Sequence, residues 1–99
     1  VCMAMFDSGM RYIAYSHRWL EDYALDERDL TGRSHYEVFP EIPDRWKEIH
    51  RRCLLGHAER CEEDYFERAD GTVQYIRWEI KPWHDAVGRV GGLLFFTES

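Results

Sequence analysis

Four residues of zinc-binding type follow one another closely in the middle of the chain. His50, Cys53, His57 and Cys61 are separated by three, four and four positions, and imidazole and thiolate groups at such spacings are ligands of structural zinc sites. Gly56, however, interrupts the expected helix between the two pairs. A separation of four on a strand also spreads His57 and Cys61 over roughly 13 Å. One compact tetrahedron is therefore hard to close, and we expect no metal site.

Catalytic chemistry finds little support in the residue types. A hydrolase needs a nucleophile, a base and an orienting acid that converge in one pocket, and the sequence has neither a nucleophile-elbow nor a metallohydrolase motif. The acidic residues are best explained as solvated strand and helix faces, including the closely spaced Glu59, Glu62, Glu63, Asp64 and Glu67. We expect no catalytic residue and no enzymatic activity in this domain.

The composition favours a single small domain whose partner is a protein or a small molecule. The 99 residues are 44% hydrophobic and 15% aromatic, which is enough for one core. The formal charge of −6 argues against nucleic acid, because a duplex binder presents a basic stripe that replaces condensed counterions. The same charge argues against an anionic membrane surface.

The cysteines and the apolar runs indicate the compartment. Cys2, Cys53 and Cys61 are an odd number without framework spacing, which favours free thiols in a reducing compartment. No apolar run reaches the roughly 18 residues that span a bilayer, and there is no signal-peptide pattern. Because the chain starts at Val1 without an initiator methionine, we expect a segment of a longer protein.

Three strands are predicted in the C-terminal half. Asp70-Gly71 lies between two alternating runs and predicts a hairpin with a two-residue turn in which both residues have positive φ. Residues 73–80 alternate, with Ile76, Trp78 and Ile80 on the apolar face.

Two further features bound these strands. Pro82 lacks an N–H for a central ladder, so residues 81–84 are expected to end or bend the second strand. Val90 to Phe96 is a nearly continuous apolar run, which suits a central strand buried on both faces.

The N-terminal half predicts a hairpin followed by short helices. Val1 to Phe6 and Arg11 to Tyr15 are apolar runs around a Gly-containing loop. Ser16 is expected to cap a first short helix with its hydroxyl, residues 26–30 form a further short turn, and Ser34 to Glu37 fits a capping box.

A longer helix is predicted to start at Pro43 and to close at Gly56. Trp46, Ile49 and Cys53 recur at helical spacing and share one face. Residues 57–66 complete the strands. The order of elements predicts an α+β fold, a five-stranded antiparallel sheet with short helices packed on one face.

Several spaced motifs stand out along the chain: Gly32 to Glu41, Arg45-Trp46 to Leu55-Gly56, Asp70-Gly71, Trp78 to Trp83, and Gly91 to Glu98. Together they resemble the motifs of PAS domains, in the subgroup found in bacterial sensor histidine kinases and cyclic-di-GMP enzymes. The resemblance covers nearly the whole chain and implies a single PAS sensory domain over residues 1–99, taken from a multidomain signalling protein. It also implies a pocket between the sheet and the helices.

Two cofactors have to be considered, because branches of the family bind flavin or haem. One branch of the family forms a thiol adduct with flavin in a motif resembling Gly-Arg-Asn-Cys, but here Gly32-Arg33-Ser34-His35 places His35 in the cysteine slot. The adduct is excluded, and noncovalent flavin is not. Another branch holds haem through a histidine on the longer helix, where this chain has Arg45, with His50 one turn further on. A histidine beside an apolar stripe is more often a packing residue, so no cofactor is favoured.

The implied pocket is lined by aromatic and aliphatic residues. Tyr36, Phe39, Trp46, Ile49, His50 and Cys53 are expected on the helical wall, with Ile76, Trp78 and Leu94 on the sheet. Such pockets hold a mostly apolar ligand fixed by one or two polar groups. The alternative, that these side chains fill the cavity themselves, stays open.

The resemblance implies a cytoplasmic sensory module. It binds a small apolar or aromatic ligand, or transmits a conformational signal to an attached output domain such as a histidine kinase or a diguanylate cyclase. The alternative is a ligand-free dimerisation or scaffold module that uses the exposed sheet face around Val73 and Tyr75. We expect a homodimer, because a two-fold contact is the commonest route to oligomers.

Overall fold

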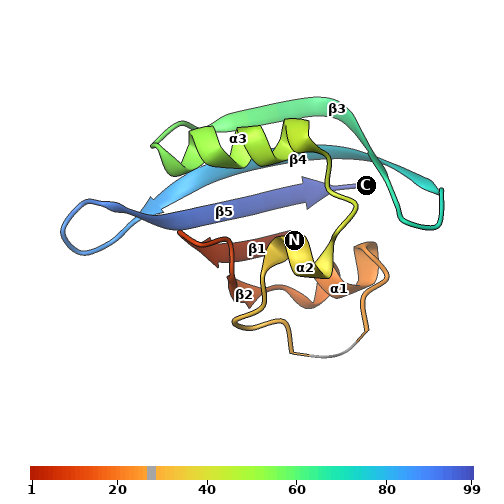
Figure 1. The fold of residues 1–99 in the computed structure, drawn as a ribbon, viewed down its shortest axis with the longest axis horizontal. Coiled ribbons are helices and arrows are strands. Elements are labelled where there is room, and N and C mark those ends of the chain that lie inside the picture. Colours follow the sequence, from red (N-terminus) through yellow and green to blue (C-terminus); the bar gives the residue numbers. More distant parts are fainter. Residues whose placement is uncertain (27–28) are drawn as a thin grey trace.

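The computed structural model describes residues 1–26 and 29–99, in which two strands and three helices precede three further strands (Figure 1). The strands are β1 (Cys2–Asp7), β2 (Tyr12–Tyr15), β3 (Glu59–Glu67), β4 (Val73–His84) and β5 (Val90–Glu98). The helices are α1 (His17–Asp22), α2 (His35–Val38) and α3 (Asp44–Leu54). The short turn predicted over residues 26–30 includes residues 27–28, which lie outside the described residues.

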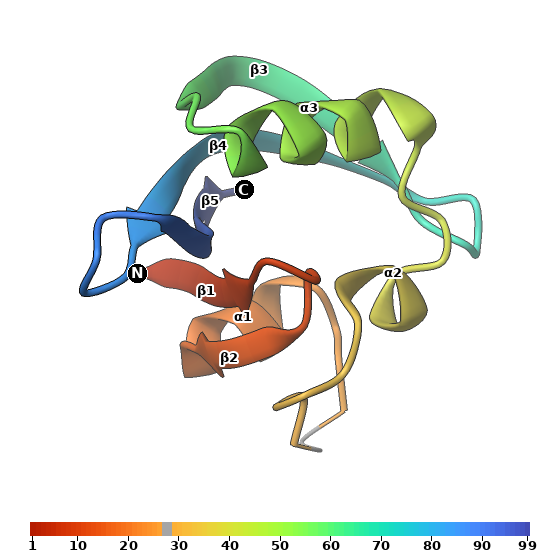
Figure 2. The same cartoon turned by 60° about the vertical axis from the view of Figure 1, so that its left-hand side comes forward.

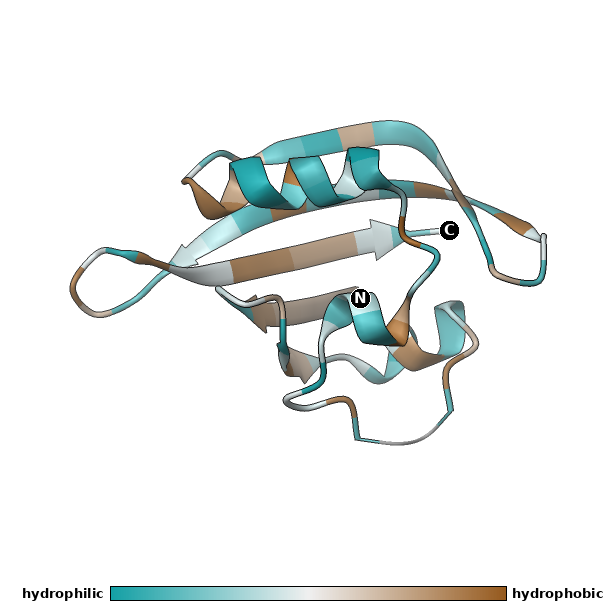
Figure 3. Cartoon of the chain, viewed as in Figure 1, coloured by the Kyte–Doolittle hydropathy of each residue, from teal (hydrophilic) through white to brown (hydrophobic). Residues whose placement is uncertain are grey.

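The strands form one antiparallel sheet in the order β2-β1-β5-β4-β3. Figures 1 and 2 show α3 along the β3–β4 side of the sheet, and α1 and α2 beside β1 and β2. Hydrophobic residues follow β5 through the centre of the sheet (Figure 3). The predicted five-stranded α+β fold is therefore confirmed.

The hairpin between β3 and β4 forms as predicted, but its turn is longer. The amide of Arg68 donates to the carbonyl of Thr72 at 2.7 Å, and the amide of Gly71 donates to the carbonyl of Arg68 at 2.9 Å. Three residues therefore lie in the loop, and of Asp70-Gly71 only the glycine has a positive φ, 87°. The predicted two-residue turn is wrong, because a type I turn followed by one left-handed glycine closes the hairpin instead.

The two serines predicted as helix caps behave differently. Ser16 precedes α1, but its hydroxyl accepts a hydrogen bond from the Met3 amide at 3.0 Å and makes no cap bond. Its predicted capping role is wrong, and the side chain instead ties the start of α1 to β1. Ser34 does cap α2, since its hydroxyl accepts from the Tyr36 amide at 3.3 Å.

Strand β4 continues through residues 81–84, where an end or a bend was predicted. β3 pairs with β4 only as far as Ile80, so beyond that point β4 has a neighbour on one side only. Pro82, paired with Leu93 of β5, needs no second ladder bond there. Trp83 then donates its indole N–H to the carbonyl of Phe6 at 2.8 Å, which ties this end of β4 to β1.

Strand β5 is central, as predicted, but its two faces differ. Leu93, Phe95 and Thr97 are buried on the helical side. Leu94 and Phe96 are only half-buried on the opposite side. The prediction of burial on both faces is wrong, because the described residues place all three helices against one face and leave the other open.

Candidate ligand site

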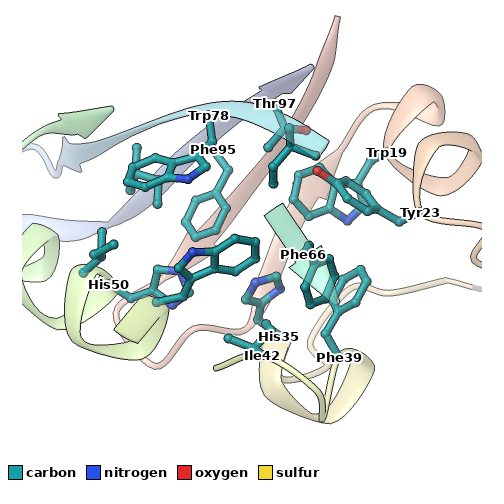
Figure 4. A pocket seen from close by; sticks show the side chains of 14 residues that line it. Trp19, Tyr23, His35, Phe39, Ile42, His50, Phe66, Trp78, Phe95 and Thr97 are labelled. Carbon is teal, nitrogen blue, oxygen red and sulfur yellow. The ribbon is translucent and has the colours of Figure 1, made fainter. Parts of the chain in front are cut away.

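A cavity of about 40 Å³ lies between the sheet and the helices (Figure 4). Its wall is formed by Trp19, Tyr23, His35, Phe39, Ile42, Trp46, Ile49, His50, Phe66, Ile76, Trp78, Ile80, Phe95 and Thr97. Among the described residues, no lysine, arginine, aspartate or glutamate reaches this wall. The polar groups available to a ligand are therefore neutral or belong to the two histidines.

The size of the cavity limits what it holds as it stands. Each enclosed water needs roughly 10–15 Å³ measured in this way, so the space takes about three waters. Pockets for drug-sized ligands measure roughly 300–1,000 Å³. The wall side chains therefore fill most of the site, and a larger ligand, flavin or haem included, enters only if the wall moves.

Six of the predicted lining residues reach the cavity. They are Phe39, Trp46, Ile49 and His50 on the helical side, with Ile76 and Trp78 on the sheet. Helical spacing in α3 and period-two alternation in β4 bring five of these side chains to one place, and Phe39 joins them from the end of α2. Ligand binding by these residues remains a prediction.

Three predicted lining residues lie elsewhere. Leu94 points to the open face of the sheet, one residue out of phase with Phe95. Cys53 is fully buried but packs towards the start of β3, where burial raises the pKa of its thiol to about 11. Tyr36 stands behind His50, with its hydroxyl 2.8 Å from the His50 Nδ1. Their placement on the cavity wall is therefore wrong.

His35 enters the cavity from α2, and hydrogen bonds fix one side of its ring. Its Nδ1 lies 3.0 Å from the Tyr12 hydroxyl, which accepts a hydrogen bond from the Trp19 indole N–H at 3.3 Å. The residue is only 5% exposed. Burial, with a smaller contribution from His50, holds the pKa of His35 well below its usual value. The ring is therefore neutral at physiological pH.

His50 enters from α3 beside His35, with the two ring centroids 5.7 Å apart. Figure 4 shows both rings opposite Trp78 and Phe95 of the sheet. Burial lowers the pKa of His50 to about 4, so this ring is also neutral. Two uncharged imidazoles, with the hydroxyl-bearing side chains of Tyr23 and Thr97, thus supply the polar groups of a mostly apolar wall.

Asp64 holds together the β3–β4 side of the site. Its carboxylate accepts hydrogen bonds from the indole N–H groups of Trp46 at 3.0 Å and Trp78 at 2.8 Å. It also accepts from the Arg45 guanidinium at 3.1 Å and from the Tyr65 amide at 2.8 Å. Burial alone would raise the pKa of Asp64, but these donors lower it below its usual range. The ionised carboxylate fixes two cavity-lining indoles.

A bulge in β3 explains why Asp64 faces inwards. The pairing of β3 with β4 shifts register between Cys61 and Asp64, and such a bulge re-aims the side chains that follow it. The sequence analysis placed Asp64 on a solvated acidic face, which is wrong. No residue type in this segment signals the bulge.

The residues weighed for zinc do not form a ligand set. His57 is exposed in the loop after α3, and the Cys61 thiol donates to the Glu63 carbonyl at 3.3 Å. Within residues 1–26 and 29–99, no group of three or more His, Cys, Asp or Glu side chains is placed to share a metal ion.

Several wall residues were not proposed from the sequence as lining residues. They are Trp19, Tyr23, His35, Ile42, Phe66, Ile80, Phe95 and Thr97. The alternation that identified Ile76 and Trp78 also pointed to Ile80. For Trp19 and Tyr23, helical spacing showed a shared face but not what it meets, because that depends on how α1 folds back over β1.

Comparison with known proteins identifies the family to which this fold belongs. A model of the family described as PAS fold matches residues 1–99. The chain belongs to the PAS-fold family. As a PAS domain, it is a sensory module rather than an enzyme. No protein among the curated sequences matches the chain.

Solved structures show the same PAS fold at low sequence identity. The PAS domain of the histidine kinase ThkA has a TM-score of 0.79 at 9% identity, with 99% of this chain and 97% of that one covered. The light-state Aureochrome1 LOV structure has a TM-score of 0.74 at 16% identity, with 99% and 80% covered. The Vibrio cholera VqmA–ligand–DNA complex has a TM-score of 0.75 at 19% identity, with 98% and 45% covered.

This PAS domain spans about half the length of the VqmA chains that it matches. Among the described residues, no helix combines the length and the apolar character needed to cross a membrane.

Proposed function

We propose that this PAS domain senses a small uncharged ligand in the cavity between its sheet and helices, as part of a longer signalling protein. The observation that carries the proposal is the composition of the wall, in which aromatic and aliphatic side chains surround two neutral histidines. A mostly apolar site with few polar groups is typical of ligand pockets. The residues that bind are Phe39, Trp46, Ile49, His50, Ile76 and Trp78, together with His35.

The small volume supports a mechanism of signalling. A ligand larger than a few waters displaces wall side chains, and it drives a change only to the extent that it binds the two arrangements differently. Trp46 and Trp78 share the Asp64 carboxylate, so displacement of either indole disturbs contacts of α3, β3 and β4 together. The change then reaches the attached output domain.

The output domain in this proposal is one such as a histidine kinase or a diguanylate cyclase, in the cytoplasm. The similarity to the PAS domain of the histidine kinase ThkA supports the first of these. VqmA was solved in complex with ligand and DNA. The charge of −6 of the present chain does not favour DNA contacts by this domain itself.

A second candidate, a ligand-free dimerisation module, is supported by the open sheet face. Tyr65 and Tyr75 are cross-strand partners in β3 and β4, with exposed fractions of 52% and 76%. Val73 lies at the end of the same face and is also exposed. Large exposed apolar side chains on neighbouring strands are typical of interaction surfaces, and both functions are compatible with a homodimer.

Native mass spectrometry of the purified protein, compared with its denatured mass, tests the proposed function. Extra mass that is lost on denaturation supports a retained ligand, and its value separates haem, flavin and a metabolite. A bare mass at twice that of the monomer, with no thermal shift across a broad metabolite panel, favours the dimerisation module. Trp46→Ala removes an indole that lines the cavity. This variant should abolish any ligand-induced shift in the unfolding temperature.

A further inference from the structure

We propose that His35 recognises the ligand by donating a hydrogen bond from its Nε2–H to an acceptor atom of a small uncharged molecule. This inference rests on the proposed function and adds the chemical class of the ligand, a carbonyl compound or an aromatic heterocycle with an unprotonated ring nitrogen. The group that fixes the donor is outside the cavity wall, at Tyr12.

The proton of His35 is placed by a chain of hydrogen bonds. The Trp19 indole N–H can only donate, and it donates to the Tyr12 hydroxyl oxygen at 3.3 Å. Burial raises the pKa of Tyr12 above its usual value, so its hydroxyl keeps its proton. That proton has one acceptor within the described residues, the His35 Nδ1 at 3.0 Å. Because a neutral imidazole carries one proton, the proton of His35 lies on Nε2.

The Nε2 atom is open to the cavity. It makes no hydrogen bond to any described residue. Among those residues, every side-chain nitrogen or oxygen that is fully enclosed has a hydrogen-bond partner, so Nε2 is not fully enclosed. A water-sized molecule therefore reaches Nε2, and the residue is otherwise buried on the cavity wall. Figure 4 shows the His35 ring in the middle of the lining side chains, between His50 and Phe66.

The surroundings select an uncharged acceptor. The described wall contains no ionised side chain, so a charged ligand loses its hydration without gaining an ion pair. An acceptor atom on an apolar body satisfies the N–H that the cavity otherwise leaves to water, and an apolar analogue of the same shape leaves it unpaired.

Three probes of nearly equal shape separate these classes: acetophenone, α-methylstyrene and benzoate. Acetophenone has a carbonyl where α-methylstyrene has a methylene group, and benzoate carries a charge. Because one net hydrogen bond changes a dissociation constant by about three- to tenfold, we expect acetophenone to bind that much more tightly than α-methylstyrene, and benzoate to bind most weakly. NMR titration of the intact chain measures the three constants.

Two hydroxyl deletions form a matched pair. Tyr12→Phe removes the donor to His35, while Tyr36→Phe removes the partner of His50, 2.8 Å from its Nδ1. We expect Tyr12→Phe to reduce the preference for acetophenone to less than about twofold, and Tyr36→Phe to retain it. The ¹⁵N spectrum of the wild-type histidines provides a readout without substitution, and it should show the His35 proton on Nε2.

The outcomes separate this inference from the proposed function. Equal binding of acetophenone and α-methylstyrene, or a His35 proton on Nδ1, overturns the role of His35 and leaves a ligand-binding domain in place if native mass spectrometry shows a retained ligand. Loss of the preference in Tyr36→Phe but not in Tyr12→Phe assigns recognition to His50 and also overturns it. Failure of all three probes to bind, together with a bare native mass, overturns both.

Discussion

His35 and Asp64 are both buried polar groups beside the same cavity, but the fold satisfies them in opposite ways. Asp64 keeps its charge and accepts hydrogen bonds from a guanidinium, two indoles and a backbone amide. His35 is neutral, and among the described residues it has a hydrogen-bond partner on Nδ1 and none on Nε2, which is left to the cavity. A group whose bonding capacity is used up holds structure in place, while a group with one open position is available to a ligand.

The two groups also differ in the elements that they join. Asp64, on β3, connects to α3 through Arg45 and Trp46, and to β4 through Trp78. His35, on α2, connects to β2 and α1 through Tyr12 and Trp19. The two groups therefore join different elements around the cavity, and a ligand that contacts both sets can change how these elements pack.

Acidification should have the largest effect, because it charges the neutral histidines. A histidine whose folded pKa is lowered binds fewer protons in the folded state than in the unfolded state, so stability is complete above pH 6.5 and falls as the pH decreases. With a pKa of about 4, His50 alone should cost about 2 kcal/mol at pH 5 and about 3 kcal/mol at pH 4. His35 adds a loss of the same sign.

Urea unfolding at pH 7, 6 and 5 measures this effect, in a range above the titration of most carboxylates. His50→Asn, whose side-chain amide still reaches Tyr36, should show a flatter profile. A midpoint that stays constant from pH 7 to pH 5 would contradict the neutral, buried state of both rings.

Asp64→Ala should lower the free energy of unfolding by about 2–3 kcal/mol. The substitution leaves the indole N–H groups of Trp46 and Trp78 without their acceptor and Arg45 without its counter-charge, and unpaired buried polar groups are costly. Because Arg45 is 44% exposed, water recovers part of the loss. Glu63→Ala, at an exposed neighbour in β3, is the control and should change stability by less than about 0.5 kcal/mol.

Tyr12→Phe should lower stability by about 1–2 kcal/mol, because it leaves the Trp19 indole and the His35 Nδ1 without their shared partner. Thermal unfolding measures the change. Tyr36→Phe is matched in chemistry, but Tyr36 is half-buried and solvent can replace its hydroxyl. If both variants lose the same stability, the hydrogen bonds of the Tyr12 hydroxyl contribute no more to folding than the contact of Tyr36 with His50.

The parts of this site that follow a simple period could be predicted from the sequence. Alternation in β4 identified Ile76 and Trp78, and helical spacing identified Trp46 and Ile49, all on the cavity wall. The prediction that Leu94 lines the cavity was wrong because the run of apolar residues in β5 has no alternation. A shift of one residue exchanges the faces of a strand, and only the pairing with β1 and β4 fixes the phase.

The two buried polar centres could not be predicted in this way. Asp64 depends on a bulge that no residue type announces. The bonds of His35 depend on Tyr12 and Trp19, which come from β2 and α1 and meet it only through tertiary packing. The sequence showed that His35 occupies the cysteine slot of the flavin-binding branch, but not which of its nitrogens is open.

Arg45→Met should have the smallest effect on stability. It separates the contribution of the guanidinium to the hydrogen bonds of Asp64 from that of the two indoles. The guanidinium lies 5.1 Å from the ring centroids of Trp46 and Tyr65, and methionine retains some of that packing. Because the ion pair is partly exposed, we expect a loss of less than about 1 kcal/mol. The pKa of Asp64 should rise, since its cationic partner is removed while both indole donors remain. NMR titration of the carboxylate measures this change.

Arg51→Met, which removes an exposed partner of Glu48, is the control and should leave the pKa of Asp64 unchanged. A loss as large as that of Asp64→Ala would mean that the guanidinium, rather than the two indoles, holds the carboxylate in place.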